Sequence, residues 1–564
     1  MASAAVFEER RGTQLDDTIP LSCTFDEPQV EGSHVTYLIR VQRGWSKDDS
    51  WGISRRYSDF VRLHSDLSNS GVELPLPPKK VFGNMDRMFI AERKAALQVY
   101  LECVLREPIL ACQLCMKRFL DPTNYDVAVD EEALRQVSMF FRNEPTWEVV
   151  ERLPNIGWRI RRHYYVVRPR DSPKAVKHML TLLPPGPQLF LSEKDLVSFF
   201  KVLQNLIHPN ILPVQFSTWN NSAALLIQPF VEHGSLRDCM NPKTKLRQPY
   251  MKKYALGGNG LSLMEIRKYC RQVLDAVKYL HDKQVPFTCF HAGNIFIDAG
   301  NVKLSGIEVA ALGLPSPYRH YIVTLKKIQT KEAEAVYTFG HLLYELTFGQ
   351  ILKVPCVEQI PATCHPELKP VLESLLTSSG VKSGMPSLSS LLASPVFPEL
   401  PTALMDAKPQ FKLGSKLKES LRTAKESAEG QLSDEQKKVS QLRRINTAKE
   451  KEKAISEEER RRRAKAKKKS LVTATSSSSV TATSSSTASA RPAQKSASPA
   501  PAAPSAPAPP PAPAPPPPAP AAPAVAAEPP ASGEGRGALL SSISGFSKGG
   551  LKKAVTNDRS APQM

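Results

Sequence analysis

The 564-residue sequence contains no apolar run of the roughly 18–20 residues that a membrane-spanning helix requires. Its first residues, MASAAVFEERRG, have no apolar core of the length found in secretory signal peptides. These absences predict a cytoplasmic or nuclear protein with at most peripheral membrane contact. The nine cysteines are scattered along the chain, and in that compartment we expect them to be mostly free thiols.

Metal-ligand patterns are equally scarce. Cys112 and Cys115, in CQLC, have the spacing of a zinc ligand pair, but a second pair of this kind is absent from the sequence. One side of a helix is therefore the simpler interpretation. The sequence predicts neither a metal site nor a cofactor.

What the sequence has is an uneven distribution of charge and proline. Globular patterns cover residues 14–126 and 146–400, with a linker expected at 127–145. Residues 401–470 are charged and basic, which predicts a marginal, exposed helix. Residues 471–534 are rich in Ser, Ala and Pro, and they bury too little apolar surface to fold, so we expect a disordered linker.

The first globular region places four residues around a possible phosphate site. Arg56 and Tyr57, in RRYSDF, close a predicted strand and lead into a helix. Lys79 follows in a proline loop, LPLPPKKVFG, and Arg93 lies on the next predicted helix. An arginine can donate two hydrogen bonds to one phosphate, and a lysine supplies a point charge for another.

This arrangement resembles a PX domain over roughly residues 14–126. The resemblance implies a small antiparallel sheet with helices and a proline loop, and a site for phosphoinositides, most often phosphatidylinositol 3-phosphate. By position, Arg56 would hold the 3-phosphate, Tyr57 would stack on the ring, Lys79 would meet the 1-phosphate and Arg93 would bind ring hydroxyls. The alternative is a PX scaffold whose basic residues pair with acids.

The second globular region carries four landmarks in the order of a protein kinase. They are LQNLIHPNILPV, ALLIQPFVEHGSLRD, LSLMEIRKYCRQVLDAVKYLHDK and VYTFGHLLYELTFGQ. The resemblance covers residues 146–400 and implies a bilobal kinase-like fold. Together with the first region, it gives an α+β multidomain protein that ends in a basic and proline-rich tail.

The positions that perform phosphoryl transfer are degenerate. The catalytic Asp should stand five residues before Asn294, where the sequence has Cys289. Gly306 stands where the metal-binding Asp is expected, and the phosphate loop keeps one glycine, Gly157. Asn294 is retained, but one neutral amide is a poor site for magnesium. We therefore expect a kinase fold without its chemistry and no catalytic residues.

Two further positions leave alternatives open. Lys177 is a possible nucleotide-binding lysine or an exposed strand residue. The glutamate that should pair with such a lysine falls near Phe199, which cannot form an ion pair. The alternative function is a weak, atypical serine/threonine kinase that uses Glu308 for the metal.

The end of the chain, residues 535–562, resembles the actin-binding WASP-homology-2 motif. Its apolar residues fall on one face of a short helix that fits a hydrophobic groove, and two lysines follow for an acidic surface. The expected contacts with monomeric actin are Leu539, Leu540, Ile543, Lys552 and Lys553.

Two low-complexity segments precede this motif. The proline run within residues 498–530 is either a polyproline II ligand for SH3 or profilin-type proteins or an inert spacer. The basic run at residues 460–470 is a solvated face, a nuclear import signal or a patch for anionic lipid. With a PX domain upstream we favour lipid, so we expect no nucleic-acid partner. A nuclear or nucleic-acid binder remains the second alternative function.

The order of these segments resembles the family of PX domain-containing kinase-like proteins over nearly the whole chain. That resemblance implies modulation of the Na,K-ATPase through its β subunits and a role in endosomal receptor trafficking. The sequence as a whole predicts a cytoplasmic adaptor, peripheral on endosomal and plasma membranes, that links phosphoinositides to actin.

Overall fold

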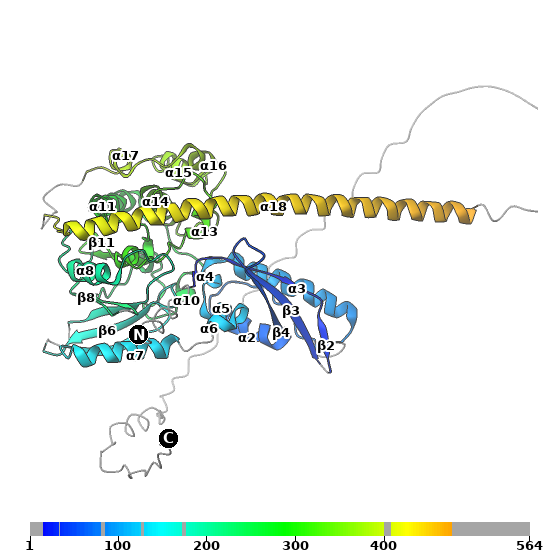
Figure 1. Ribbon diagram of the computed structural model, residues 1–564, viewed down its shortest axis with the longest axis horizontal. Helices are drawn as coiled ribbons and strands as arrows, with labels where there is room; N and C mark the ends of the chain where they lie inside the picture. The colour runs from blue at the N-terminus through cyan, green and yellow to red at the C-terminus, as the bar shows by residue number, and fades with distance from the viewer. Residues whose placement is uncertain are drawn as a thin grey trace, which may run out of the picture. The chain divides into compact units, whose positions relative to one another are not determined.

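The computed structural model describes residues 15–476 apart from 33, 81–84, 126–128, 172–175, 221 and 400–407 (Figure 1). The side chains of residues 129, 450, 453, 454 and 460–476 are not described. The expected actin-binding motif, the proline run and the side chains of the basic run therefore lie outside the described part. Within that part, none of the helices is both long and apolar enough to cross a bilayer.

The first globular region is built on a four-stranded antiparallel sheet in which β3 pairs with β1, β2 and β4. Its strands are β1 (Leu21–Phe25), β2 (Gln29–Glu31), β3 (His34–Arg43) and β4 (Ser50–Arg56). Tyr37, Ile39 and Val41 alternate along β3 and are buried, because successive side chains of a strand face opposite sides of the sheet.

Helices cover the buried face of this sheet. They are α2 (Tyr57–Ser68), α3 (Arg87–Arg106), α4 (Pro108–Ala111), α5 (Leu114–Leu120) and α6 (Pro122–Tyr125). The long helix expected in this region is confirmed as α3, with Leu97 and Leu101 fully buried. The apolar core continues onto Tyr250 and Tyr254, so the first region packs against the second.

The prediction of a linker at residues 127–145 is wrong. Helix α7 (Val129–Asn143) occupies most of this segment, and its residues Ala133 and Val137 are buried against the sheet of the second region. The amphipathic spacing of these two residues, one helical turn apart, is the signal that the sequence offered.

The second region has two lobes. The smaller lobe is a five-stranded antiparallel sheet in the order β5-β6-β7-β9-β8, and α8 packs against it in addition to α7. Its elements are β5 (Trp147–Leu153), β6 (His163–Pro169), β7 (His178–Leu183), α8 (Glu193–Leu203), β8 (Phe216–Trp219) and β9 (Ala224–Pro229). Phe199 lies on α8, at the position where the glutamate that pairs with the strand lysine was expected. Its apolar side chain is fully buried.

The larger lobe is mainly helical. Its elements are α9 (Leu236–Met240), α10 (Tyr250–Tyr254), α11 (Leu263–Asp282), η1 (Ala292–Asn294), β10 (Ile295–Asp298), β11 (Asn301–Leu304), α12 (Glu308–Ala311), α13 (Arg319–Ile322), α14 (Lys331–Phe348), α15 (Lys369–Leu376), α16 (Ser378–Ser383) and α17 (Leu388–Leu392). Ser262 and Glu265 form a capping box that begins α11. Gly349, with a φ of 72°, ends α14 in the left-handed conformation that suits glycine.

The prediction of an exposed basic helix is wrong for the first part of α18 (Ser415–Ser476), which lies along the larger lobe beside α13 (Figure 1). Leu421, Leu432 and Val439 are buried against that lobe. The Gln436 amide nitrogen lies 2.8–3.1 Å from the main-chain oxygens of Ile322, Leu325 and Ile328. Ile322 is the last residue of α13, and the other two follow this helix. This contact makes α18 an integral part of the larger lobe.

Candidate functional site

The four residues expected to bind phosphoinositide lie around the proline loop. The Arg93 guanidinium lies between two aromatic rings, with its Cζ 4.2 Å from the ring centres of both Tyr57 and Phe89. Arg93 Nη2 donates to the Pro78 carbonyl at 3.3 Å, and the Tyr57 hydroxyl donates to the Pro77 carbonyl. Arg93 is 7% exposed, and its Nε has no hydrogen-bond partner among the described residues. A buried guanidinium with an unused donor is well placed to bind an acceptor group of a ligand.

Arg56 and Lys79 carry further positive charge, next to Tyr57 and Pro78 in the chain. Both side chains are exposed, and Arg56 stands at the N-terminus of α2. Among the described residues, carboxylates within ion-pair distance of Arg56, Lys79 or Arg93 are absent. The alternative in which these cations only pair with acids therefore finds no support in this part of the chain.

The cleft between the two lobes is the second candidate site. It lies where β5 and β6 face the catalytic-loop segment around η1, and it retains a cavity of about 90 Å³. Ligand sites usually measure about 300–1,000 Å³, so this volume is small for a nucleotide. Side chains of the chain itself fill the remaining space.

Two arginines occupy the positions where phosphoryl-transfer groups would stand. Arg159 Nη2 lies 3.3 Å from the Cys289 Sγ and donates to the Pro315 carbonyl at 2.6 Å. Arg162 Nη2 donates to Glu308 Oε1 at 2.8 Å, and these side chains are only 10% and 2% exposed. Both arginines follow Gly157, in the segment that should cradle phosphates. In this protein that segment folds inward and places cations of its own in the cleft.

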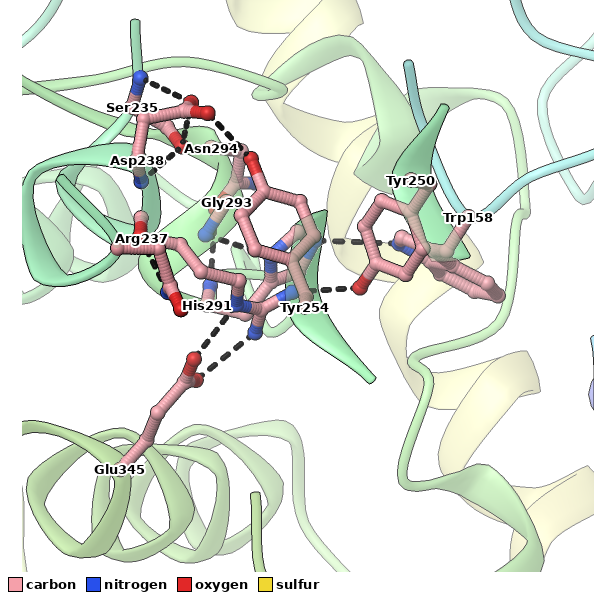
Figure 2. Close-up of polar contacts among 11 residues, drawn as sticks. Trp158, Ser235, Arg237, Asp238, Tyr250, Tyr254, His291, Gly293, Asn294 and Glu345 are labelled. Carbon is pink, nitrogen blue, oxygen red and sulfur yellow. Dashed lines mark hydrogen bonds and ion pairs between the residues drawn. The ribbon is translucent and has the colours of Figure 1, made fainter. Parts of the chain in front are cut away.

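Trp158 forms part of the cavity wall and contacts the catalytic-loop segment at His291 (Figure 2). Its indole Nε1 lies 3.1 Å from His291 Nε2, while the Gly293 amide lies 3.1 Å from His291 Nδ1. Burial, together with Arg237, Arg159 and Arg162, lowers the pKa of His291 well below its ordinary value. The ring is therefore neutral, and because a neutral imidazole has one acceptor nitrogen, one of the two contacts is a hydrogen bond at any time.

A buried polar network supports this arrangement from the larger lobe (Figure 2). Arg237 donates to both carboxylate oxygens of Glu345, at 2.5 and 2.8 Å, and to the Tyr250 hydroxyl at 2.5 Å. Asp238 accepts from Lys253 at 2.6 Å and from the Tyr254 hydroxyl at 2.7 Å. Because both carboxylates are already bound to cations of the chain, neither is available as a metal ligand.

The retained asparagine is also engaged. Asn294 Nδ2 donates to the Cys289 carbonyl at 2.9 Å, and its Oδ1 accepts from the His291 amide at 2.8 Å. Gly306 has a φ of 90°, and a Cβ at this position would lie 2.9 Å from Asn294 Nδ2. Clusters of three or more His, Cys, Asp and Glu side chains that suit a metal are absent from the described residues.

The structure places Lys177 apart from these groups. Its Nζ lies 3.2 Å from Glu232 Oε1, both side chains are largely exposed, and Lys177 is not part of the cavity wall. On β7 it is Met179 that reaches the cavity.

Cys112 and Cys115 are free thiols, and burial raises the pKa of each to about 11. The sequence analysis did not predict that Arg159 and Arg162 would lie in the cleft. The segment GWRIRR shows that cations are present but not the direction in which they point.

Comparison with known proteins supports the division of the chain. The models that match are PX domain, over residues 43–123, Protein kinase domain, over 189–357, and WH2 motif, over 532–561. The fold and the site thus define a protein that combines a PX domain with a kinase-like domain and an actin-binding type of motif.

Three relatives show how far the similarity extends along the chain. The PX domain-containing protein kinase-like protein of Mus musculus is 46% identical over 77% of this chain and 74% of its own. Slowpoke-binding protein of Drosophila melanogaster is 32% identical over 37% of this chain and 42% of its own. Probable inactive serine/threonine-protein kinase slob1 of Dictyostelium discoideum is 27% identical over 51% and 52%. The chain belongs to the family of PX domain-containing protein kinase-like proteins.

Proposed function

We propose that the protein is a peripheral membrane adaptor whose PX domain binds phosphatidylinositol 3-phosphate, whose C-terminal motif binds monomeric actin and whose kinase-like domain contacts proteins without transferring phosphate. The observation that carries the proposal is Arg93, buried between two aromatic rings with an unused donor beside Arg56 and Lys79. The proposed roles are those of the sequence: phosphate contacts from Arg56 and Lys79, stacking from Tyr57 and hydroxyl contacts from Arg93.

Liposome sedimentation of the full chain tests the lipid site. Arg56→Ala should abolish binding to vesicles that contain phosphatidylinositol 3-phosphate, because it removes a bidentate phosphate contact. Arg62→Ala is the matched control, since Arg62 lies on the same helix and is 79% exposed. Equal binding of the Arg56→Ala and Arg62→Ala chains would contradict the site. Vesicles with phosphatidylinositol 4-phosphate or phosphatidylserine separate stereospecific recognition from charge attraction alone.

The kinase-like domain is proposed to be inactive because Arg159 and Arg162 occupy the cleft beside Cys289 and Glu308. Losing a positioned base costs about 10²–10⁴ in rate, and losing the metal ligand removes charge stabilisation as well. We expect no magnesium-dependent transfer of radiolabelled phosphate by the full chain. Transfer that disappears in a Glu308→Ala variant would instead establish the atypical kinase.

Actin binding is proposed for residues 535–562, with Leu539, Leu540 and Ile543 as anchors and Lys552 and Lys553 as rim charges. Buried apolar anchors dominate such interfaces, whereas rim charges mainly affect association rate and salt dependence. In a titration of a labelled peptide of residues 533–564 against monomeric actin, Leu540→Ala should weaken binding far more than Lys552→Ala. Absence of saturable binding, or the reverse order, would contradict the motif.

The partners of the kinase-like domain are proposed from relatives. Slowpoke-binding protein is named for a protein that it binds, which supports a protein partner for this chain. The Na,K-ATPase β subunits, an endosomal location and SH3 or profilin-type ligands of the proline run rest on the family resemblance. Co-precipitation of the full chain with β subunits, compared with a chain that lacks residues 498–530, separates the pump from the proline-dependent partners.

A further inference from the structure

A second and larger cavity lies between the PX domain and the larger lobe. It measures about 330 Å³, within the usual range of small-molecule sites, which occur preferentially at domain interfaces. Its wall is mostly apolar and is made by residues of both domains, among them Ile19, Leu105, Ile109, Tyr318, Ile351 and Leu352. None of the four phosphoinositide residues contributes to it, so the cavity is separate from that site.

One buried cation in this wall has no carboxylate partner. Lys117, on α5, is 5% exposed, and its Nζ donates to the Asp17 carbonyl at 3.3 Å. Ion pairs within 4 Å of Lys117 are absent among the described residues. The Asp17 carboxylate, which accepts from the Tyr125 hydroxyl, acts on Lys117 only from a longer distance. Burial lowers the pKa of Lys117, as expected for an ammonium that is removed from water.

The other Lys and Arg side chains of the wall differ from Lys117. Arg237 is paired with Glu345, Lys353 is paired with Glu107, and Arg106 is exposed to solvent. An unbalanced buried ammonium is costly unless a further anion compensates it. An anionic ligand would provide that compensation, and the apolar wall would surround the rest of such a ligand.

We propose that this cavity binds a single-chain lipid with an anionic head. The acyl chain packs along Ile109, Tyr318 and Ile351, and the carboxylate or phosphate head accepts hydrogen bonds from Lys117. The volume favours one chain over the two of a membrane phospholipid. A nucleotide or sugar fits less well, because such ligands need many polar partners and most of the wall area is apolar. A bound lipid would join the PX domain to the kinase-like domain through shared contacts.

Binding to the full chain, measured by native mass spectrometry and calorimetry, tests the proposal. The probes are palmitate, 1-palmitoyl lysophosphatidate and hexadecanol, which has the same chain length as palmitate and no charge. We expect one saturable site for at least one anion, and hexadecanol should bind roughly tenfold or more weakly, since a hydrogen bond to a charged group is lost. Tighter binding of palmitate assigns a carboxylate head, and tighter binding of lysophosphatidate assigns a phosphate head.

Variants separate this cavity from general lipid affinity. Lys117→Met should weaken anion binding roughly tenfold and leave hexadecanol binding unchanged. Lys194→Met is the control on the exposed face of α8 and should match the wild type. Ala111→Phe, which fills the cavity, should block every probe if the chain keeps its wild-type melting temperature. Arg56→Ala should lose phosphoinositide and still bind the anion. Equal binding by Lys117→Met and wild type, or no saturable binding of either anion, would overturn the proposal.

Discussion

Replacing Arg162 by methionine leaves the Glu308 carboxylate buried without its cation. The two side chains are 10% and 2% exposed, and their hydrogen bond measures 2.8 Å. Removing one partner of a buried ion pair typically costs about 3–5 kcal/mol. Domains of this kind are stable by only about 5–15 kcal/mol, so the loss should be a large share of the total. We expect a marked fall in the urea midpoint of the kinase-like domain.

The double variant Arg162→Met/Glu308→Leu is the decisive comparison. Replacing both members of a buried pair by apolar groups is often close to neutral, because no charge is left without a partner. The double variant should therefore be more stable than Arg162→Met, with a coupling energy of about 3 kcal/mol or more. Urea unfolding followed by circular dichroism and tryptophan fluorescence measures all three chains.

A control and a refuting result complete this test. Arg135→Met removes a cation whose partner, Glu132, is also exposed and lies on the same helix, α7, and its midpoint should match that of the wild type. If Arg162→Met is as stable as the control, the arginine does not occupy the cleft. Magnesium and ATP should leave the wild-type midpoint unchanged, because a ligand that binds the folded state would raise it.

Three further outcomes are expected. Burial lowers the pKa of His341 to about 3, below the ~6.5 of an unfolded chain, so protonation favours unfolding and stability falls as the pH drops below about 6.5. Between pH 7.5 and 5.5, the free energy of unfolding in urea should therefore fall by about 1.4 kcal/mol less for His341→Leu than for the wild type. An equal fall in both chains would show that protonation of His341 is not responsible. Leu432→Ala should cost about 2–5 kcal/mol in urea unfolding because Leu432, on α18, is fully buried against the larger lobe, whereas Ile445→Ala, at a 40% exposed position of the same helix, should change stability by less than about 0.5 kcal/mol. Tyr57→Phe keeps the ring over Arg93 and should retain most liposome binding, while Tyr57→Ala should lose it, and equal binding by the two would show that stacking is unimportant.

The elements of the fold followed from local patterns. The landmark LSLMEIRKYCRQVLDAVKYLHDK and the predicted strand that closes at Arg56 depend on neighbours in sequence, and they appear in the structure as α11 and β4. The buried face of α18 was partly predictable, since Leu421, Leu432 and Val439 are 11 and 7 residues apart, close to whole numbers of helical turns. Most of the residues between them are charged or polar, so the apolar face was not recognised.

The contents of the cleft depended on contacts between distant parts of the sequence. Cys289 and Gly306 were identified because they occupy fixed offsets from Asn294. The inward direction of Arg159 and Arg162 was not predictable, because their partners lie about 130 and 146 residues away. Lys177 shows that sequence position alone can mislead. It stands near the position of the nucleotide-binding lysine of a kinase, but its side chain forms an ion pair with Glu232 instead.

The backbone at Gly306 restricts which side chains this position can carry. Its left-handed φ of 90°, together with a Cβ position 2.9 Å from Asn294 Nδ2, means that aspartate cannot be introduced here by one substitution without strain. The new Cβ would also lie 3.9 Å from Arg162 Nη1, so the carboxylate of such an aspartate would meet a cation of the chain itself. Gly306→Asp alone is therefore not expected to create a metal site in this cleft.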